Sequence, residues 1–258
     1  MTILQTPALV LRTTVQAEAD LIVSLYTRER GKIRAAAKSA LKSHKRFPGQ
    51  LELFNHLEVS LRSSRLPDLP LLEQSRLLDD FPHLRPHLEK VAAASFLAEV
   101  TETASGEFDP NPAVYRLLLQ AFRRLDREAR PEPILWASLL RLLDHLGYRP
   151  ALETCALCQR PLPERGLFFS AGAGGALCPG CGKKTAPAAR LANSTLRTFQ
   201  SALRLPPSRL KRLGFTQSVL QEAAALLPAY AEYHLGRELK TYRFLRELSR
   251  PFDRGKFA

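Results

Sequence analysis

Apolar residues in the first eighty positions occur in short runs that are typical of β-strands. Five runs are rich in β-branched or alternating apolar residues, and polar or glycine-containing breaks separate them. They cover residues 7–15, 20–27, 31–38, 50–61 and 71–75. Several short strands at this spacing favour a small closed barrel, and five strands suit a barrel of the OB type.

After residue 82 the apolar positions follow the three-and-four spacing of amphipathic helices. This spacing predicts six helices, which begin near residues 83, 114, 134, 194, 216 and 238. Gly147 is placed to end the third helix in a left-handed conformation, and Ser194 and Thr216 are placed to cap the two helices that follow. The chain is therefore predicted to be α+β, with a five-stranded barrel followed by a helical domain.

All four cysteines lie in two closely spaced pairs. Cys155 and Cys158 form one C-x2-C pair, Cys178 and Cys181 form the other, and 19 residues separate the pairs. This spacing is typical of a zinc site in which four thiolates hold one ion in tetrahedral geometry. Two disulfides and free buried thiols are the alternatives, and disulfides are disfavoured in an intracellular chain. Four sulfur ligands close the site, so the ion is expected to be structural.

The segment between the two cysteine pairs suits a zinc ribbon. Phe168 and Phe169 are predicted to lie in a short strand, and residues 172–175 in its turn. The chain is accordingly expected to have three parts. These are an OB-fold DNA-binding domain at 1–80, a helical domain made of 81–150 and 183–258, and an embedded zinc-binding module at 151–182.

The charge of the chain points to a polyanionic partner. Its 38 Lys and Arg residues against 25 Asp and Glu residues give a formal net charge of +13 and a pI near 10.0. The net charge is +3 over residues 1–80, zero over 81–150 and +10 over 151–258. Such a surplus favours nucleic acid, or an acidic protein or membrane surface. The neutral middle is expected to be structural or to face a protein.

Ten cations are the candidate nucleic-acid contacts. Eight lie within residues 28–46, where only Glu29 opposes them, and two lie in the last helix. The ten are Arg28, Arg30, Lys32, Arg34, Lys38, Lys42, Lys45, Arg46, Lys240 and Arg243. A strand would place Lys32, Arg34 and Lys38 on one face, and a basic loop after it would track a phosphate backbone. Simple solvation of these charges is the alternative.

Neither catalysis nor membrane insertion is indicated. The sequence contains no P-loop, no G-x-S-x-G or H-E-x-x-H motif and no paired-carboxylate cluster, so we expect no enzyme. No apolar run approaches the roughly 20 residues that a membrane helix needs. The N-terminus lacks the features of a signal peptide. We therefore expect a soluble cytoplasmic protein that is associated with the nucleoid.

Several blocks of sequence, taken together, are specific enough to indicate a family. They cover residues 9–12, 20–27, 31–33, 37–38, 49–54, 233–241 and 244–245, with the four-cysteine segment between them. In these blocks and in their order, nearly the whole chain resembles the RecO family of bacterial recombination mediators. The chain departs from the family at Ser39, where many members have Gly, and at Thr241, where Ser is common.

The resemblance implies a non-catalytic protein of DNA recombination and repair, which responds to DNA damage. It implies binding to single-stranded and double-stranded DNA, annealing of complementary strands, and one structural Zn²⁺ ion. It also implies work with RecR, contact with single-stranded-DNA-binding protein, and help in loading RecA. From the residues alone, a zinc-ribbon adaptor whose basic surface binds an acidic protein partner is the competing interpretation.

Overall fold

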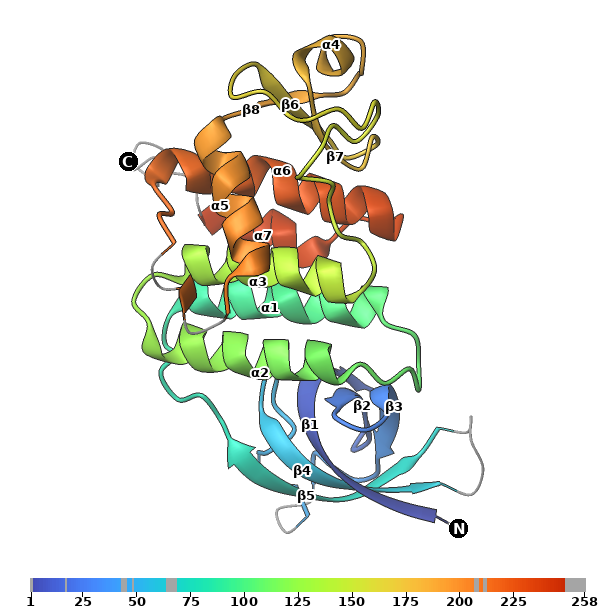
Figure 1. The fold of residues 1–258 in the computed structure, drawn as a ribbon. Helices are drawn as coiled ribbons and strands as arrows, with labels where there is room; N and C mark the ends of the chain where they lie inside the picture. Colours follow the sequence, from blue (N-terminus) through green and yellow to red (C-terminus); the bar gives the residue numbers. More distant parts are fainter. Residues whose placement is uncertain are drawn as a thin grey trace, which may run out of the picture.

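The molecule has a β-barrel at one end, helices in the middle and a small sheet at the far end (Figure 1). The computed structural model describes residues 2–16, 18–42, 46–47, 49–63, 69–206, 209–210 and 213–248. This arrangement confirms the predicted α+β class. Within the described residues, no helix combines the length and the apolar character that crossing a bilayer requires.

The N-terminal strands form a closed barrel in the order β1-β2-β3-β5-β4. The strands are β1 (Thr2–Val15), β2 (Leu21–Thr27), β3 (Gly31–Ala37), β4 (His56–Ser63) and β5 (Leu71–Asp79). Neighbours pair antiparallel except β3 and β5, which are parallel and meet at Ala36 and Leu71. The barrel therefore has the five strands that the OB type requires.

Strand β1 contributes to two hydrophobic cores at once. Ala8 and Val10 point into the barrel, whereas Leu9 and Leu11 point outward and pack in the core of the helical region. All four side chains are buried, with at most 4% of their surface exposed. Because successive side chains of a strand alternate between its faces, a continuous apolar run indicates a strand that is buried on both sides.

The fourth strand begins later than its apolar pattern predicts. Residues 50–55 are irregular, with Phe54 at a φ of 74°, and β4 starts only at His56. Leu51 is nevertheless buried in the barrel core, and Phe54 is buried among the helices. Loop residues that fill cores on both sides produce the same alternating pattern as a strand, which explains the error.

Six longer helices of the described residues form the middle of the molecule. They are α1 (Leu88–Ala104), α2 (Pro112–Arg127), α3 (Pro131–His145), α5 (Asn193–Arg204), α6 (Gln217–Leu235) and α7 (Lys240–Leu248). Phe96, Phe122 and Phe199 are fully buried between them. A carboxylate joins the first helix to the last, since Glu99 accepts hydrogen bonds from the backbone N–H groups of Lys240 (3.0 Å) and Thr241 (2.8 Å).

Two of the three predicted helix ends are confirmed. Thr216 caps α6, because its hydroxyl accepts a hydrogen bond from the N–H of Val219 at 3.4 Å. Gly147 follows α3 with a φ of +87°. The Ser194 cap is wrong, since α5 already begins at Asn193 and no side chain caps it. Ser194 therefore lies in the first turn of α5.

The loop after α1 holds the barrel against the helices. Its Phe108 N–H donates to the carbonyl of Lys32 at 2.9 Å. Gly31, at a φ of +65°, lies so close to this loop that a Cβ atom there would be 1.9 Å from the carbonyl oxygen of Asp109. A side chain at position 31 would thus push the barrel away from the loop.

We expect Gly31→Ala to lower the free energy of unfolding by more than 2 kcal/mol, measured by urea denaturation. The left-handed backbone costs roughly 1–2 kcal/mol for a residue with a Cβ, and the overlap with Asp109 adds to it. Gly49→Ala is the matched control, since Gly49 also has a φ of +65° but nothing within 4 Å of the added atom. Equal losses in the two variants would show that the close approach carries no energetic weight.

Candidate metal centre and nucleic-acid interface

A three-stranded sheet in the order β7-β6-β8 carries the cysteine segment. It contains β6 (Leu167–Ser170), β7 (Gly175–Leu177) and β8 (Ala189–Leu191), and the short helix α4 (Pro179–Gly182) lies beside it. The predicted strand at Phe168 and Phe169 and its turn are confirmed by β6 and β7. The third strand lies past residue 182, so this small sheet draws on more of the chain than residues 151–182.

The fold brings the four cysteine sulfurs together. The ligand atoms of Cys155, Cys158, Cys178 and Cys181 all lie within 4.8 Å of one another, and none is in a disulfide. Each pair is held in a tight turn by a backbone hydrogen bond, from Gln159 N–H to Cys155 at 2.9 Å and from Gly182 N–H to Cys178 at 2.8 Å. Four convergent thiols fit a metal ion that prefers sulfur ligands.

The surroundings of the cluster favour a thiolate at Cys155 and Cys158. Burial raises the pKa of the Cys155 thiol, but backbone hydrogen bonds from Cys158, Cys178 and Leu157 outweigh burial and lower the pKa to about 6. The side-chain hydrogen bond with Cys158 raises the pKa of Cys181 to about 12, so this thiol keeps its proton at pH 7. Thiolate is the form that binds metal, so an entering cation must displace this proton.

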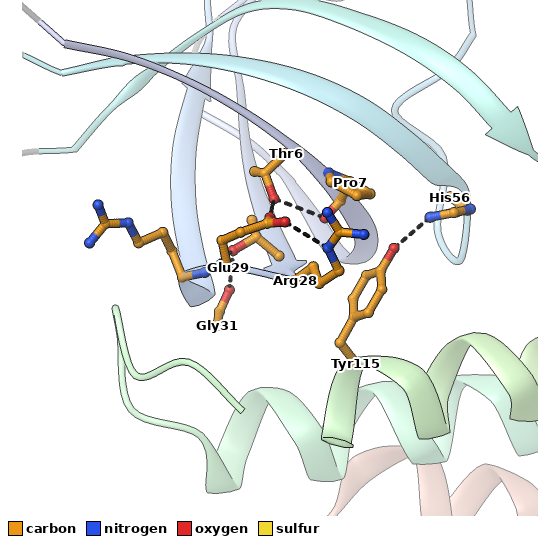
Figure 2. A network of polar contacts seen from close by, with 9 residues as sticks. Thr6, Pro7, Arg28, Glu29, Gly31, His56 and Tyr115 are labelled. Atoms are coloured by element: carbon orange, nitrogen blue, oxygen red, sulfur yellow. Dashed lines mark hydrogen bonds and ion pairs between the residues drawn. The ribbon is translucent and has the colours of Figure 1, made fainter. Parts of the chain in front are cut away.

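The candidate cations of the barrel begin at the turn between β2 and β3, which lies close to α2 (Figure 2). The Nε of Arg28 lies 2.6 Å from Glu29 Oε1, and the Glu29 carboxylate also accepts a hydrogen bond from the hydroxyl of Thr6. The side chain of Arg28 remains 57% exposed. Arg30 is exposed and forms no ion pair with any described residue. This turn therefore presents positive charge to solvent.

Lys32 and Arg34 face the helices. As the alternation predicts, Ile33 and Ala35 point into the barrel, and the two cations lie on its outer face. The ammonium of Lys32 donates to the carbonyl of Glu102 at 2.8 Å, and burial lowers its pKa. Arg34 pairs with Glu107. A phosphate that reached Lys32 would have to displace its partner, whereas the side chain of Arg34 remains 58% exposed beside Glu107.

The remaining barrel cations follow β3. Lys38 and Lys42 are exposed and form no ion pair within the described part of the chain. Arg46 donates to the carbonyl of Lys38 at 2.8 Å, and its guanidinium lies 5.5 Å from the centre of the Phe47 ring. Phe47 is buried in the barrel core, so it anchors the loop there. Lys45 lies outside the described residues.

The two candidates of the last helix lie apart from these. Lys240 and Arg243 are exposed on α7 and form no ion pair with described residues. Helix α7 packs on α1, so these cations belong to the helical region and not to the barrel surface. The fold therefore divides the nine predicted contacts that it describes between two surfaces.

Sequence analysis missed a row of arginines on α2. Arg116, Arg123 and Arg127 are all exposed, at the spacing i, i+7 and i+11 that places residues on one side of a helix. A count of charges over residues 81–150 hid them, because acidic residues of α1 and its following loop cancel them. The helical spacing of Arg116, Arg123 and Arg127 is the signal in the sequence that indicates this row.

A buried polar contact joins β4 to α2 near the β2–β3 turn. His56 Nε2 and the Tyr115 hydroxyl lie 2.7 Å apart (Figure 2). Burial, with a further contribution from Arg123, lowers the pKa of His56 to about 4, and burial raises the pKa of Tyr115 to about 12. Both groups are neutral at pH 7, so the pair joins the two parts of the fold without a charge.

Comparisons with known proteins cover nearly the whole chain. The family described as Recombination protein O N terminal matches residues 1–81, and Recombination protein O C terminal matches residues 85–243. A protein of Desulfatibacillum aliphaticivorans named DNA repair protein RecO is 33% identical over 95% of this chain and 97% of its own length. A protein of the same name in Pelotomaculum thermopropionicum is 34% identical over 95% of this chain and 94% of its own length. One in Anaeromyxobacter dehalogenans is 36% identical over 93% of this chain and 94% of its own length.

We expect acidification to destabilise the protein through His56. The pKa of His56 is below its ordinary value in the folded state, so the unfolded chain binds the proton first. The contribution of neutral His56 to the free energy of unfolding is therefore fully present above about pH 6.5. As the pH drops toward 4, the free energy of unfolding falls by about 2–3 kcal/mol. His56→Gln should reduce this fall in urea denaturation at pH 7 and pH 4.5. His83→Gln is the control at an exposed histidine, and identical pH profiles for wild type and His56→Gln would contradict the assignment.

Proposed function

The chain belongs to the RecO family, and from this premise we propose that it is a non-catalytic DNA-binding mediator of recombination in DNA repair. In this proposal it binds single-stranded and double-stranded DNA and anneals complementary strands. With RecR it helps RecA to load onto DNA that is covered by single-stranded-DNA-binding protein. The names of its relatives support a role in DNA repair. They do not favour the zinc-ribbon adaptor as an alternative.

Exposed cations on an OB-type barrel carry the DNA-binding proposal. Arg30, Lys38 and Lys42 project from the β2–β3 turn and from the segment after β3, without ion-pair partners among the described residues. Cations that neutralise phosphates release condensed counterions, which favours binding without regard to sequence. Barrels of the OB type bind nucleic acid on a strand face and on the loops beside it.

Annealing follows from the same electrostatics. Two strands that are bound on one basic surface no longer repel each other fully, because protein cations neutralise part of their charge. Holding both strands also raises their local concentration. This mechanism needs no reacting side chain, which agrees with the proposal that the protein is not an enzyme. The proposed location is the cytoplasm, at the nucleoid.

For the cysteine cluster we propose one structural Zn²⁺ ion, held by Cys155, Cys158, Cys178 and Cys181. When bound, the ion would stabilise the fold of the small sheet and leave no open position for chemistry. The cluster lies at the opposite end of the molecule from the barrel (Figure 1). Its expected role is therefore to stabilise the zinc module, and DNA binding by the barrel does not depend on it directly. The three predicted domains remain the proposed division of the chain.

We expect Lys38→Gln with Lys42→Gln to weaken binding of single-stranded DNA and to flatten its dependence on salt. Loss of two phosphate contacts should reduce the slope of log affinity against log salt by about 1.4. Fluorescence anisotropy between 50 and 300 mM salt measures this slope. Arg204→Gln with Arg197→Gln is the control, since both are exposed cations outside the barrel. A wild-type protein whose affinity does not depend on salt would contradict the proposal.

Strand annealing tests the mediator role. The wild type should accelerate pairing of complementary strands, both bare and covered with single-stranded-DNA-binding protein, and the Lys38/Lys42 variant should be slower in both assays. Acceleration of bare strands alone would support annealing and contradict action on covered DNA.

We expect purified protein to contain one zinc ion per chain, measured by elemental analysis. Cys158→Ser with Cys181→Ser should abolish the zinc content and lower the thermal midpoint, while binding to DNA at 20 °C stays close to wild type. A thiol titration of the denatured, metal-free protein should find four thiols. Disulfides would reduce that number, and four thiols without any metal would identify the cluster as free cysteines.

A further inference from the structure

Two of the three arginines in the row on α2 make no ion pair with a described residue that would account for them as part of the fold. Of its three members, only Arg123 has an ion-pair partner among the described residues, with its Nε 3.5 Å from Asp79 Oδ2 at the end of β5. Arg116 and Arg127 form no ion pair within the described part of the chain, and both are exposed. The apolar face of α2 is buried on the other side, through Leu118, Phe122 and Leu125.

Within residues 81–150, the positive and the negative side chains are concentrated in different elements. Helix α2 has four arginines and one aspartate, whereas α1 and the loop after it contain five acidic residues, which include Glu102, Glu107 and Asp109. Glu107 pairs with Arg34 on the barrel, and Arg124 of α2 pairs with Glu128. The exposed side of α2 is therefore positive although residues 81–150 have no net charge.

The row continues the basic surface of the barrel. Tyr115 of α2 reaches β4 through His56, and both Arg28 and Arg123 are close enough to its hydroxyl to affect its pKa electrostatically. Figure 2 shows Arg28 beside Tyr115, where the β2–β3 turn approaches α2. Arg28 and Arg123 thus both lie near this buried hydroxyl, together with the carboxylates of Glu29 and Glu58. The turn and the helix together present a basic strip.

The spacing along the helix suits a phosphate backbone. At a rise of 1.5 Å per residue, Arg123 lies about 10 Å from Arg116 and about 6 Å from Arg127 along the axis. Their directions fall within an arc of about 40°. The aromatic residues of α2 are buried, so this side has no ring on which a base could stack. A row of guanidinium groups on a side without such a ring is suited to contacts with the phosphate backbone, which carry no sequence information.

We propose that Arg116, Arg123 and Arg127 form a second phosphate-binding row, along which a nucleic-acid backbone passes from the β2–β3 turn onto α2. The row binds single strands and duplexes alike, without sequence preference. This inference rests on the proposed DNA-binding function and extends it to a helix whose segment of the chain has no net charge.

The triple variant Arg116→Gln, Arg123→Gln and Arg127→Gln tests this row. Arg and Gln have similar helix propensities and the positions are exposed, so the fold should be retained, which circular dichroism checks. Affinity at 100 mM salt should fall about ten- to a hundredfold for single-stranded and duplex DNA of any sequence. The salt slope should fall by about 2.7 for duplex and about 2 for single strands.

A matched variant removes the same charge elsewhere. This variant combines Arg149→Gln, Arg197→Gln and Arg204→Gln. The three arginines are exposed, lie outside the barrel and α2, and each has a carboxylate beside it. A slope that is unchanged in the α2 variant overturns the inference, as does an equal reduction in the matched variant. The inference is also overturned if the α2 row binds only an acidic protein, because the α2 variant then binds DNA as well as the wild type does. If the wild type itself does not bind DNA, the proposed function fails first, and the two failures are thus distinct.

Discussion

The burial of β1 on both faces is the constraint on which the rest of the structure depends. One strand lines the barrel with Ala8 and Val10 and lines the helical core with Leu9 and Leu11. Because the two cores share this wall, the barrel cannot turn relative to the helices without exposing apolar surface. Two further contacts fix this joint between the barrel and the helices. They are the close approach of Gly31 to the loop after α1 and the contact between His56 and Tyr115.

This joint also decides which charges face solvent. The outer face of β3 lies against the loop after α1, so Lys32 and Arg34 have partners in the helical region. Cations beyond the joint, at the β2–β3 turn, after β3 and along α2, remain exposed. Burial of a charge without a partner is costly, so the partly buried ammonium of Lys32 is held by the Glu102 carbonyl of α1. Arg34 stays exposed and pairs with Glu107 of the loop after α1. The segregation of charge is thus a consequence of the packing.

The cysteine cluster is built by a different and more local constraint. Two tight turns are closed by backbone hydrogen bonds, and each turn orients two sulfurs toward the centre of the cluster. The small sheet brings the two turns together. Since the ligand spacing within each pair is short, the sequence is sufficient to predict the cluster. The sheet that orients it also includes β8, which lies after the second pair and carries no cysteine.

The sequence by itself determined the five-stranded barrel, the helices and the cysteine cluster, because each follows from periodicity or from spacing over a few residues. It misplaced the start of β4, because loop residues that fill a core imitate a strand. It also misplaced the cap of α5, which lies two residues earlier, at Ala192. The sequence could not show that Lys32 and Arg34 face carboxylates and carbonyls about seventy residues away, nor that three arginines of a segment without net charge adjoin the barrel. Only the tertiary structure decided these, because the exposure of a charge depends on which distant surface packs against it.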